Sequence, residues 1–174
     1  MKNALIAVGI VLAINAKTFS LNPAPQPIKK PVPITKRISQ SELTCLAKNI
    51  YYEAGNESYD GKLAVATVTM NRVRHPRFPK TVCGVVYQRT TKGCQFSWTC
   101  GSKRPMNNSL YQRAKRVATE VLTKNVRVVS LKNALYFHNT SIKPNWTFAR
   151  PIKQIGNHIF YAANTYGKKE RNGS

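Results

Sequence analysis

Residues 49–71 read NIYYEAGNESYDGKLAVATVTMN. This stretch holds Glu53, Glu57 and Asp60, three of the six acidic residues in a chain with 28 Lys and Arg. A helix would place Glu53 and Glu57 on one face, because they lie four positions apart. The aromatic and apolar neighbours of Glu53 favour its protonated form, as a general acid near neutral pH requires. The alternative is a structural helix end with two solvated carboxylates.

Helices are expected on both sides of these acids. The first begins at Ser39 or Ser41, where Ser39 and Glu42 have the spacing of a capping box, and Gly55 ends it. The second runs from about residue 60 to 73, and it is apolar on almost every side. Such a helix is typical of the centre of a domain.

The rest of the chain predicts further helices and a small β element. Thr81 can cap a short helix through Tyr87, and residues 107–123 keep apolar side chains at helical spacing. Residues 94–100 indicate a loop or short hairpin. Strand-like composition occurs at residues 126–130, 134–138 and 158–162. We therefore expect a single, mainly α domain with a small β element.

The chain has 174 residues and a net charge of +22. That length allows one domain with a sizeable core and a tail. Residues 1–40 contribute +6 and the remainder +16, so the charge is spread over the folded part. Such a field favours polyanions, for example nucleic acid, anionic lipid or an anionic cell wall. The alternative is a charge that serves solubility alone.

The N-terminal residues indicate export. Residues 1–16 combine a lysine with a short apolar run, which predicts a signal peptide or, if uncleaved, a signal anchor. A linker rich in Pro and Lys follows at residues 17–38, with alternating prolines typical of an extended spacer. The catalytic domain is then expected at residues 39–168 and a flexible tail at 169–174.

The four cysteines are Cys45, Cys83, Cys94 and Cys100. An even count behind a signal peptide predicts two disulfides, with three connectivities open. A zinc site is the rival interpretation, but there is no C-x-x-C and the three histidines are far apart in sequence. We therefore expect no metal and no cofactor.

Two histidines have similar surroundings. His138 and His158 each lie beside Phe and Asn, in YFHN and GNHIF. Each is either a satisfied core histidine or, close to Trp146, part of a sugar-binding cleft that supplies hydrogen bonds and a stacking surface.

Several segments, in this order, resemble the cell-wall hydrolase family of the SleB/CwlJ type, named for spore-cortex-lytic enzymes. The resemblance covers about residues 42–162. The matching segments are LTCLAKNIYYEAGNE (43–57), GKLAVATVTMNRV (61–73), RFPKTVCGVVYQ (77–88), CQFSWTC (94–100), ALYFHN (134–139), Trp146 and IGNHIFY (155–161).

The resemblance implies a lysozyme-like or lytic transglycosylase-like fold and peptidoglycan as substrate. The first Glu of the family's E-A-x-x-E motif is its catalytic acid and falls on Glu53, and the second falls on Glu57, a supporting residue. The family commonly has Arg-Gly where this chain has Gly55-Asn56. The other candidate substrate-binding or supporting residues are Tyr52, Asn71, Gln95, Phe96, Ser97, His138, Asn139, Trp146 and His158.

The shortage of acids favours a one-carboxylate route between N-acetylmuramic acid and N-acetylglucosamine. A two-carboxylate glycosidase needs a second acid about 5 to 9 Å away, and Glu57 would stack too close along the same helix. Glu53 is therefore expected to form 1,6-anhydro ends, as in lytic transglycosylases, with hydrolysis by water as the alternative.

Peptidoglycan and the anionic envelope are the expected partners. Nucleic acid is not expected behind a signal peptide, and a membrane only through residues 1–16 if uncleaved. The oligomeric state stays open. We expect a periplasmic or extracellular protein, of cellular or phage origin. A non-catalytic cationic envelope-binding protein is the remaining rival.

Overall fold

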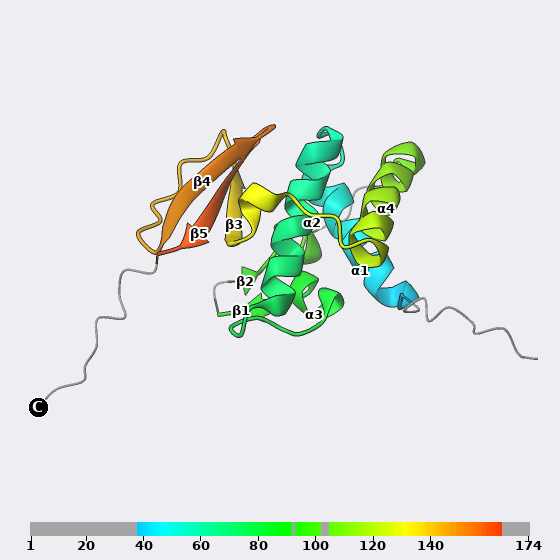
Figure 1. Cartoon of the computed structure of the whole chain (residues 1–174), viewed down its shortest axis with the longest axis horizontal. Coiled ribbons are helices and arrows are strands. Elements are labelled where there is room, and N and C mark those ends of the chain that lie inside the picture. Colours follow the sequence, from blue (N-terminus) through cyan, green and yellow to red (C-terminus); the bar gives the residue numbers. More distant parts are fainter. Residues whose placement is uncertain (1–37, 92, 102–104, 165–174) are drawn as a thin grey trace, which may run out of the picture. The chain divides into compact units, whose positions relative to one another are not determined.

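The computed structural model describes residues 38–91, 93–101 and 105–164. The predicted signal peptide and tail, and the linker before residue 38, lie outside these residues. The elements are α1 (Gln40–Ala54), α2 (Tyr59–Arg74), α3 (Val82–Val86), β1 (Arg89–Thr90), β2 (Gly93–Cys94), η1 (Ser97–Thr99), α4 (Asn108–Thr123), η2 (Val129–Leu131), β3 (Ala134–Asn139), β4 (Ala149–Ile155) and β5 (His158–Ala163) (Figure 1). The expectation of a mainly α domain with a small β element is confirmed.

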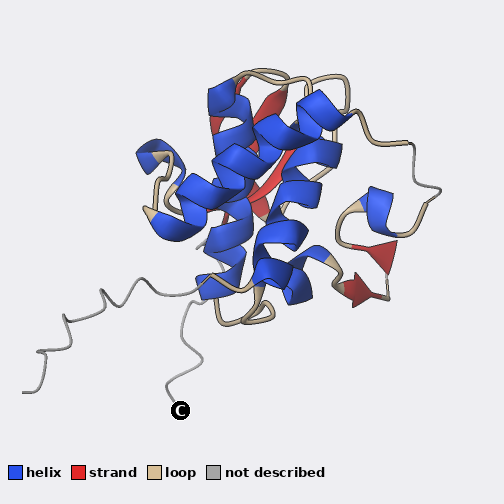
Figure 2. Ribbon diagram, turned by 90° about the vertical axis from the view of Figure 1, so that its right-hand side faces the viewer, coloured by secondary structure: helices blue, strands red, loops and turns tan. Residues whose placement is uncertain are grey.

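Helix α2 lies at the centre, as its apolar sequence predicts. Every residue from Gly61 to Thr69 is buried. Its side chains contribute to both hydrophobic clusters of the described domain. One cluster lies among α1, α3 and α4, and the other lies against the sheet. Figure 2 shows the helices on one side of the three-stranded sheet. No helix in the described ranges is long and apolar enough to cross a bilayer.

The sheet has the antiparallel order β3-β5-β4. Phe137 of β3 pairs with Phe160 of β5, and Asn139 pairs with His158. Alternate residues of a strand point to opposite faces. Phe137, Phe160 and His158 therefore share the face that is turned toward α2, because Phe160 packs in the cluster that α2 shares with the sheet.

One expected strand does not form, and one strand of the sheet was missed. Residues 126–130 do not form a strand, because they enter the turn η2 and the Val128 N–H donates to Thr67 Oγ1 at 3.1 Å. Strand β4 was not predicted. It is a polar edge strand with Pro151 and a bulge between Pro151 and Lys153, features that suit edges and weaken the sequence signal.

The predicted capping box is also wrong. Ser39 is the N-cap of α1, but its side chain makes no capping hydrogen bond there. The Glu42 carboxylate instead accepts hydrogen bonds from the N–H groups of Val82, at 2.6 Å, and Cys83, at 3.1 Å. Glu42 therefore caps α3, which lies far along the chain, and ties it to α1.

The disulfides adopt one of the three connectivities left open. Cys45 of α1 bonds Cys83 of α3, and Cys94 bonds Cys100 around the turn η1. The first bridge joins the same two helices as Glu42. The second closes a local loop.

We predict that Glu42→Gln lowers the free energy of unfolding by about 1 kcal/mol, because a neutral amide is a weaker acceptor for the first N–H groups of α3. Ser39→Ala is the control, and its effect should stay within about 0.5 kcal/mol. Urea unfolding measures both changes. Equal losses in the two variants would mean that the capping box does form in solution.

We predict that the two bridges contribute unequally to stability. The sequence separation is 38 for Cys45–Cys83 and 6 for Cys94–Cys100. The loop-closure relation gives the longer loop about 1.5 kcal/mol more stabilisation. Urea midpoints of Cys45→Ala/Cys83→Ala and Cys94→Ala/Cys100→Ala, both kept oxidised, test this. Four free thiols in the denatured, unreduced wild type would contradict both bridges.

Candidate active site

A cavity of about 340 Å³ lies where the C-terminal end of α1 meets the sheet. The fold brings together there segments of the described domain that are far apart in the sequence. The lining residues are Tyr51, Tyr52, Glu53, Ala54, Gly55, Asn56, Glu57, Pro105, Leu110, Asn139 and His158. Of the candidates chosen from the sequence, Tyr52, Glu53, Glu57, Asn139 and His158 line this cavity.

Glu53 is partly buried in the last turn of α1. Burial raises the pKa of its carboxyl from the ordinary 4.5 to about 7, and the Arg72 guanidinium opposes part of the shift. Desolvation is the larger of these two effects. Among the described residues, Arg72 forms no ion pair with Glu53. Near neutral pH, a substantial fraction of Glu53 therefore carries a proton that it can donate.

Arg72, which lies on α2, is the cation that lowers the pKa of Glu53. Its Nε donates to the carbonyl oxygen of Leu135 at 2.8 Å. The guanidinium carbon lies 5.5 Å from the ring centroid of Phe78 and 5.1 Å from that of Phe96. These contacts hold the side chain in place, so its effect on Glu53 is fixed.

Glu57 does not stack on Glu53 along one helix as expected, because α1 ends at Ala54. Glu57 lies in the turn that follows, and its N–H donates to the Ala54 carbonyl oxygen at 3.0 Å. Its carboxylate accepts from the Asn157 N–H at 3.4 Å and lies 4.0 Å from His158 Nδ1. Glu57 therefore links the α1–α2 turn to the β4–β5 turn.

His158 is 5% exposed, and its Nδ1 is buried without a hydrogen-bond partner. Burial lowers the pKa of His158; Glu57 works against this shift and His138 adds to it. His158 is therefore mainly neutral near pH 7, and it faces the cavity beside its cross-strand partner Asn139.

Trp98 is a contributor that the sequence analysis missed. Its ring stacks on Tyr52, with centroids 4.5 Å apart and an interplanar angle of 18°. Trp98 Nε1 donates to Asn49 Oδ1 at 3.1 Å, and Asn49 Nδ2 donates to Thr69 Oγ1 at 3.1 Å. Trp98 thus orients the Tyr52 ring at the cavity. Its place inside the CQFSWTC segment was the available signal.

The QFS segment lies outside the lining of this cavity. Phe96 is 3% exposed and belongs to the helical core, under the Arg72 guanidinium. The Gln95 N–H donates to the Gln88 carbonyl oxygen at 2.9 Å, and Ser97 begins η1. Phe96 therefore contacts the guanidinium that opposes the pKa shift of Glu53.

His138 and Trp146 lie elsewhere. His138 precedes Asn139 in β3, so its side chain points to the other face of the sheet. His138 Nε2 hydrogen-bonds the Tyr161 hydroxyl at 2.8 Å, and the ring of Trp146 packs 5.5 Å from that of His138. The structure therefore places His138 and His158 on opposite faces, not around one cleft.

Asn71 has a structural position. Its Nδ2 donates to the carbonyl oxygens of Leu131, at 2.8 Å, and Ala134, at 2.9 Å. It anchors the chain before β3 to α2 and lines a different, larger cavity. Among the described residues, no group of three or more His, Cys, Asp and Glu side chains could hold a metal ion.

The sequence model of the cell wall hydrolase family matches residues 56–161. The spore cortex-lytic enzyme of Bacillus subtilis is 32% identical over 126 residues, which are 70% of this chain and 38% of the relative. The enzyme of the same name from Halalkalibacterium halodurans is 30% identical over 134 residues, 76% of this chain and 38% of the relative. The chain thus spans less than half the length of these relatives.

The catalytic domain of the germination-specific lytic transglycosylase SleB from Bacillus anthracis has a similar structure, with a TM-score of 0.56 and 28% identity. The match covers 72% of this chain and 97% of that domain. The catalytic domain of Bacillus cereus SleB gives a TM-score of 0.52 at 28% identity, over 71% of this chain and 91% of that domain. The expected lysozyme-like, lytic transglycosylase-like fold is confirmed.

The family match covers more than half of the chain and includes about half of the cavity lining, and it begins just after Glu53. The chain belongs to the cell wall hydrolase family.

Proposed function

We propose that this protein cleaves the glycosidic bond between N-acetylmuramic acid and N-acetylglucosamine in peptidoglycan, as a lytic transglycosylase with Glu53 as its acid. The observation that supports this most is a carboxyl with a pKa of about 7 at the wall of an open cavity. The SleB catalytic domains, named as lytic transglycosylase domains in one case, support the reaction class.

In the proposed reaction, the Glu53 carboxyl donates its proton to the glycosidic oxygen as the bond from that oxygen to C1 of the muramic acid breaks. The ionised Glu53 then accepts the proton of the sugar's own 6-hydroxyl. The oxygen of that hydroxyl bonds to C1 and closes the 1,6-anhydro ring. Glu53 ends protonated again, and no water is consumed. One carboxyl thus serves as acid and then as base.

Glu57 is the other carboxylate that lines the cavity. Its contacts with Asn157 and His158 hold it against the sheet, which favours a positioning role. Glu57 also provides the specific reason to consider a second reaction. A carboxylate in the same cavity could orient a water molecule for hydrolysis, which would leave reducing muramic ends.

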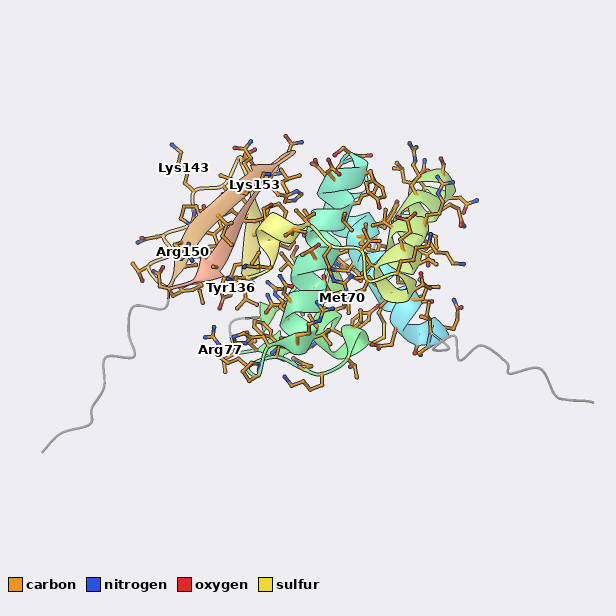
Figure 3. All side chains as sticks on the ribbon, in the orientation of Figure 1. Met70, Arg77, Tyr136, Lys143, Arg150 and Lys153 are labelled. Carbon is orange, nitrogen blue, oxygen red and sulfur yellow. A yellow bond between two sulfur atoms is a disulfide. The ribbon has the colours of Figure 1, made fainter. Side chains whose placement is uncertain are left out.

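The positive charge suits the substrate. Basic side chains such as Arg77, Lys143, Arg150 and Lys153 project from the surface (Figure 3). An anionic wall and envelope would concentrate a protein of net charge +22. We propose that the protein acts outside the cytoplasm, where such a wall lies.

We predict that Glu53→Gln lowers the rate of fragment release from purified peptidoglycan by about 100-fold or more, because the amide cannot donate the proton. Mass spectrometry of the soluble fragments measures both rate and chemistry. Anhydro-muramic ends from the wild type support transglycosylation, and reducing ends indicate hydrolysis. Glu120→Gln on α4 is the control and should retain activity. Undiminished release by Glu53→Gln would contradict a catalytic role for Glu53.

We predict that kcat/KM falls as pH rises above about 7, because Glu53 must be protonated to act. The same shift predicts the pH dependence of stability. A carboxyl whose folded pKa lies above its unfolded value stabilises the protein below the unfolded pKa, and that contribution is lost as pH rises through the folded one.

The stability difference between Glu53→Gln and wild type should therefore move in favour of the variant between pH 4.5 and about 7. Urea unfolding at several pH values measures this difference, with Glu120→Gln as the reference for loss of a half-buried carboxyl outside the cavity. A pH-independent difference for Glu53→Gln would show that the Glu53 pKa is not raised.

A further inference from the structure

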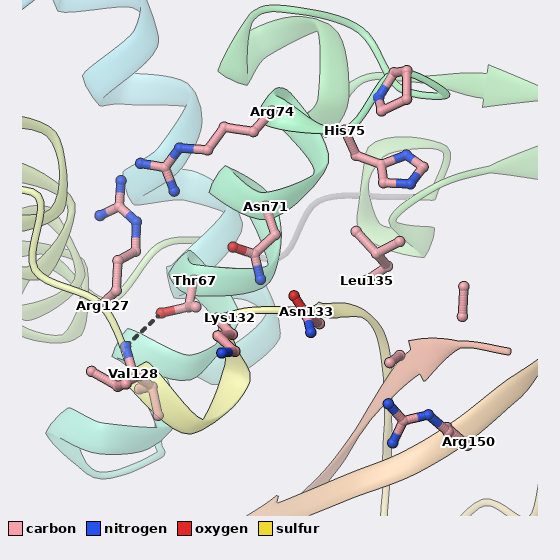
Figure 4. Close-up of a pocket in the computed structure, with 14 residues that line it drawn as sticks. Thr67, Asn71, Arg74, His75, Arg127, Val128, Lys132, Asn133, Leu135 and Arg150 are labelled. Carbon is pink, nitrogen blue, oxygen red and sulfur yellow. Dashed lines mark hydrogen bonds between the residues drawn. The ribbon is translucent and has the colours of Figure 1, made fainter. Parts of the chain in front are cut away.

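A second cavity, of about 710 Å³, lies beside the C-terminal end of α2, where η2 and the strands of the sheet meet. It has no lining residue in common with the Glu53 cavity. It is lined by Thr67, Asn71, Arg74, His75, Pro76, Arg127, Val128, Val129, Lys132, Asn133, Leu135, Arg150, Ala162 and Ala163 (Figure 4). The proposed glycan chemistry therefore does not account for this cavity.

Four cations line this second cavity: Arg74, Arg127, Lys132 and Arg150. The described lining includes no Asp or Glu, and none of the four forms an ion pair with any described residue. Figure 4 shows Arg74 and Arg127 toward one side of the cavity and Arg150 toward the other. The cavity is thus a concentration of positive charge without an internal counterion.

Arg74 and Arg127 are held in place despite their like charges. Arg74 Nη2 donates to Asn125 Oδ1 at 2.8 Å, and Arg127 Nη1 donates to the Val121 carbonyl oxygen at 2.9 Å. Burial lowers the pKa of Arg127 to about 10, and Arg74 adds to the shift. Arg127 Nε is buried without a hydrogen-bond partner. An anion between the two groups would relieve their repulsion.

The remaining walls are largely apolar. Leu135 and Ala162 are buried in the floor, and Val128 and Ala163 lie beside them. Val129 is 81% exposed, although it is a large apolar side chain next to cations. Guanidinium groups form paired hydrogen bonds to phosphate oxygens, and apolar walls bind hydrocarbon groups.

We propose that this cavity binds an amphiphilic phosphate, with the phosphate group at the cations and the attached hydrocarbon on the apolar walls. Such a group occurs as the headgroup of a membrane lipid or in a soluble phosphorylated amphiphile. The site would hold the enzyme to this ligand without using Glu53. The inference goes beyond the proposed glycan cleavage and does not depend on it.

The first test is isothermal titration of the oxidised full chain with hexyl phosphate at constant ionic strength, compared with inorganic phosphate. We expect saturable one-site binding of hexyl phosphate, at least about tenfold tighter than inorganic phosphate, because buried methylene groups add affinity. Absence of saturable binding, or equal affinity for the two probes, would overturn the proposal.

The second test uses Lys132→Gln/Arg150→Gln. Neither side chain hydrogen-bonds to a described residue, so the fold should persist. The matched control is Arg89→Gln/Lys143→Gln, which removes the same two charges from exposed positions outside both cavities. Affinity for hexyl phosphate should fall about tenfold or more in the first variant and stay within about twofold in the control. Equal losses would indicate nonspecific charge attraction and contradict the site.

Two further measurements identify the source of the phosphate and distinguish phosphate binding from the proposed glycan cleavage. Binding to vesicles that contain phosphatidic acid, beyond binding to phosphatidylcholine vesicles, and its loss in Lys132→Gln/Arg150→Gln would identify a membrane headgroup. Binding of hexyl phosphate without binding to vesicles would identify a soluble amphiphile. Glu53→Gln should bind hexyl phosphate like the wild type, so failure of one proposal leaves the other standing.

Discussion

The enclosure of α2 is the constraint on which the rest of the described domain depends. A helix that is buried from Gly61 to Thr69 needs protein on all sides. Its polar side chains must also find partners inside, and Thr67 and Thr69 do so by donating to the carbonyl oxygens of Leu63, at 2.8 Å, and Val65, at 3.0 Å. Helices cover one side of α2 and the sheet covers the other. The end of α1, and with it Glu53, therefore lies at the junction of the two layers.

A close contact at Gly156 joins these layers next to the acid. Gly156 has φ +55°, a conformation that favours glycine, and any Cβ at this position would overlap the Glu57 carboxylate. The β4–β5 turn can therefore approach the α1–α2 turn closely enough for the Asn157 N–H to reach Glu57. This contact fixes where β5 places His158 relative to Glu53. A site built from distant segments thus depends on one residue without a side chain.

Features set by local spacing could be predicted from the sequence. The three long helices, the short helix after Thr81 and the strands β3 and β5 follow from periodicity and composition. The neighbours of Glu53 made it a candidate acid beside a purely structural alternative, and the family resemblance decided between the two. Features set by distant contacts could not. Glu42 has the spacing of a capping box, yet its partners are 40 and 41 residues away. Residues 149–155 form strand β4 because they pair with β5, and their polar sequence does not predict a strand.

In the candidate site too, residues set by local sequence could be predicted and those set by distant contacts could not. Tyr52 was selectable from the motif, but the stacking of Trp98 on it requires the fold. His138 and His158 have similar neighbours in sequence and lie on opposite faces of the sheet. Strand register decides between the two faces, and a shift by one residue reverses the answer. Sequence context alone therefore could not tell which histidine faces the acid.

The charge of the protein makes the environment of Glu53 more demanding. In a chain of net charge +22, the surrounding cations favour the ionised form of any carboxyl. Arg72 does act in this direction, yet burial prevails and the pKa of Glu53 reaches about 7. Desolvation must therefore exceed the opposing Coulombic effect by the equivalent of more than two pKa units, or about 3 kcal/mol. An additional cation beside the acid would reduce that margin.

The departure from the family's Arg-Gly pattern bears on this balance. An arginine in place of Gly55 would add a positive charge next to Glu53. It would also not fit this backbone, because a Cβ on Gly55 would lie 2.5 Å from the Tyr51 carbonyl oxygen. Gly55 lets the end of α1 pack tightly. Arg72 on α2 then remains the cation that lowers the pKa of Glu53. The glycine thus allows the tight turn after α1 and also avoids an additional positive charge beside Glu53.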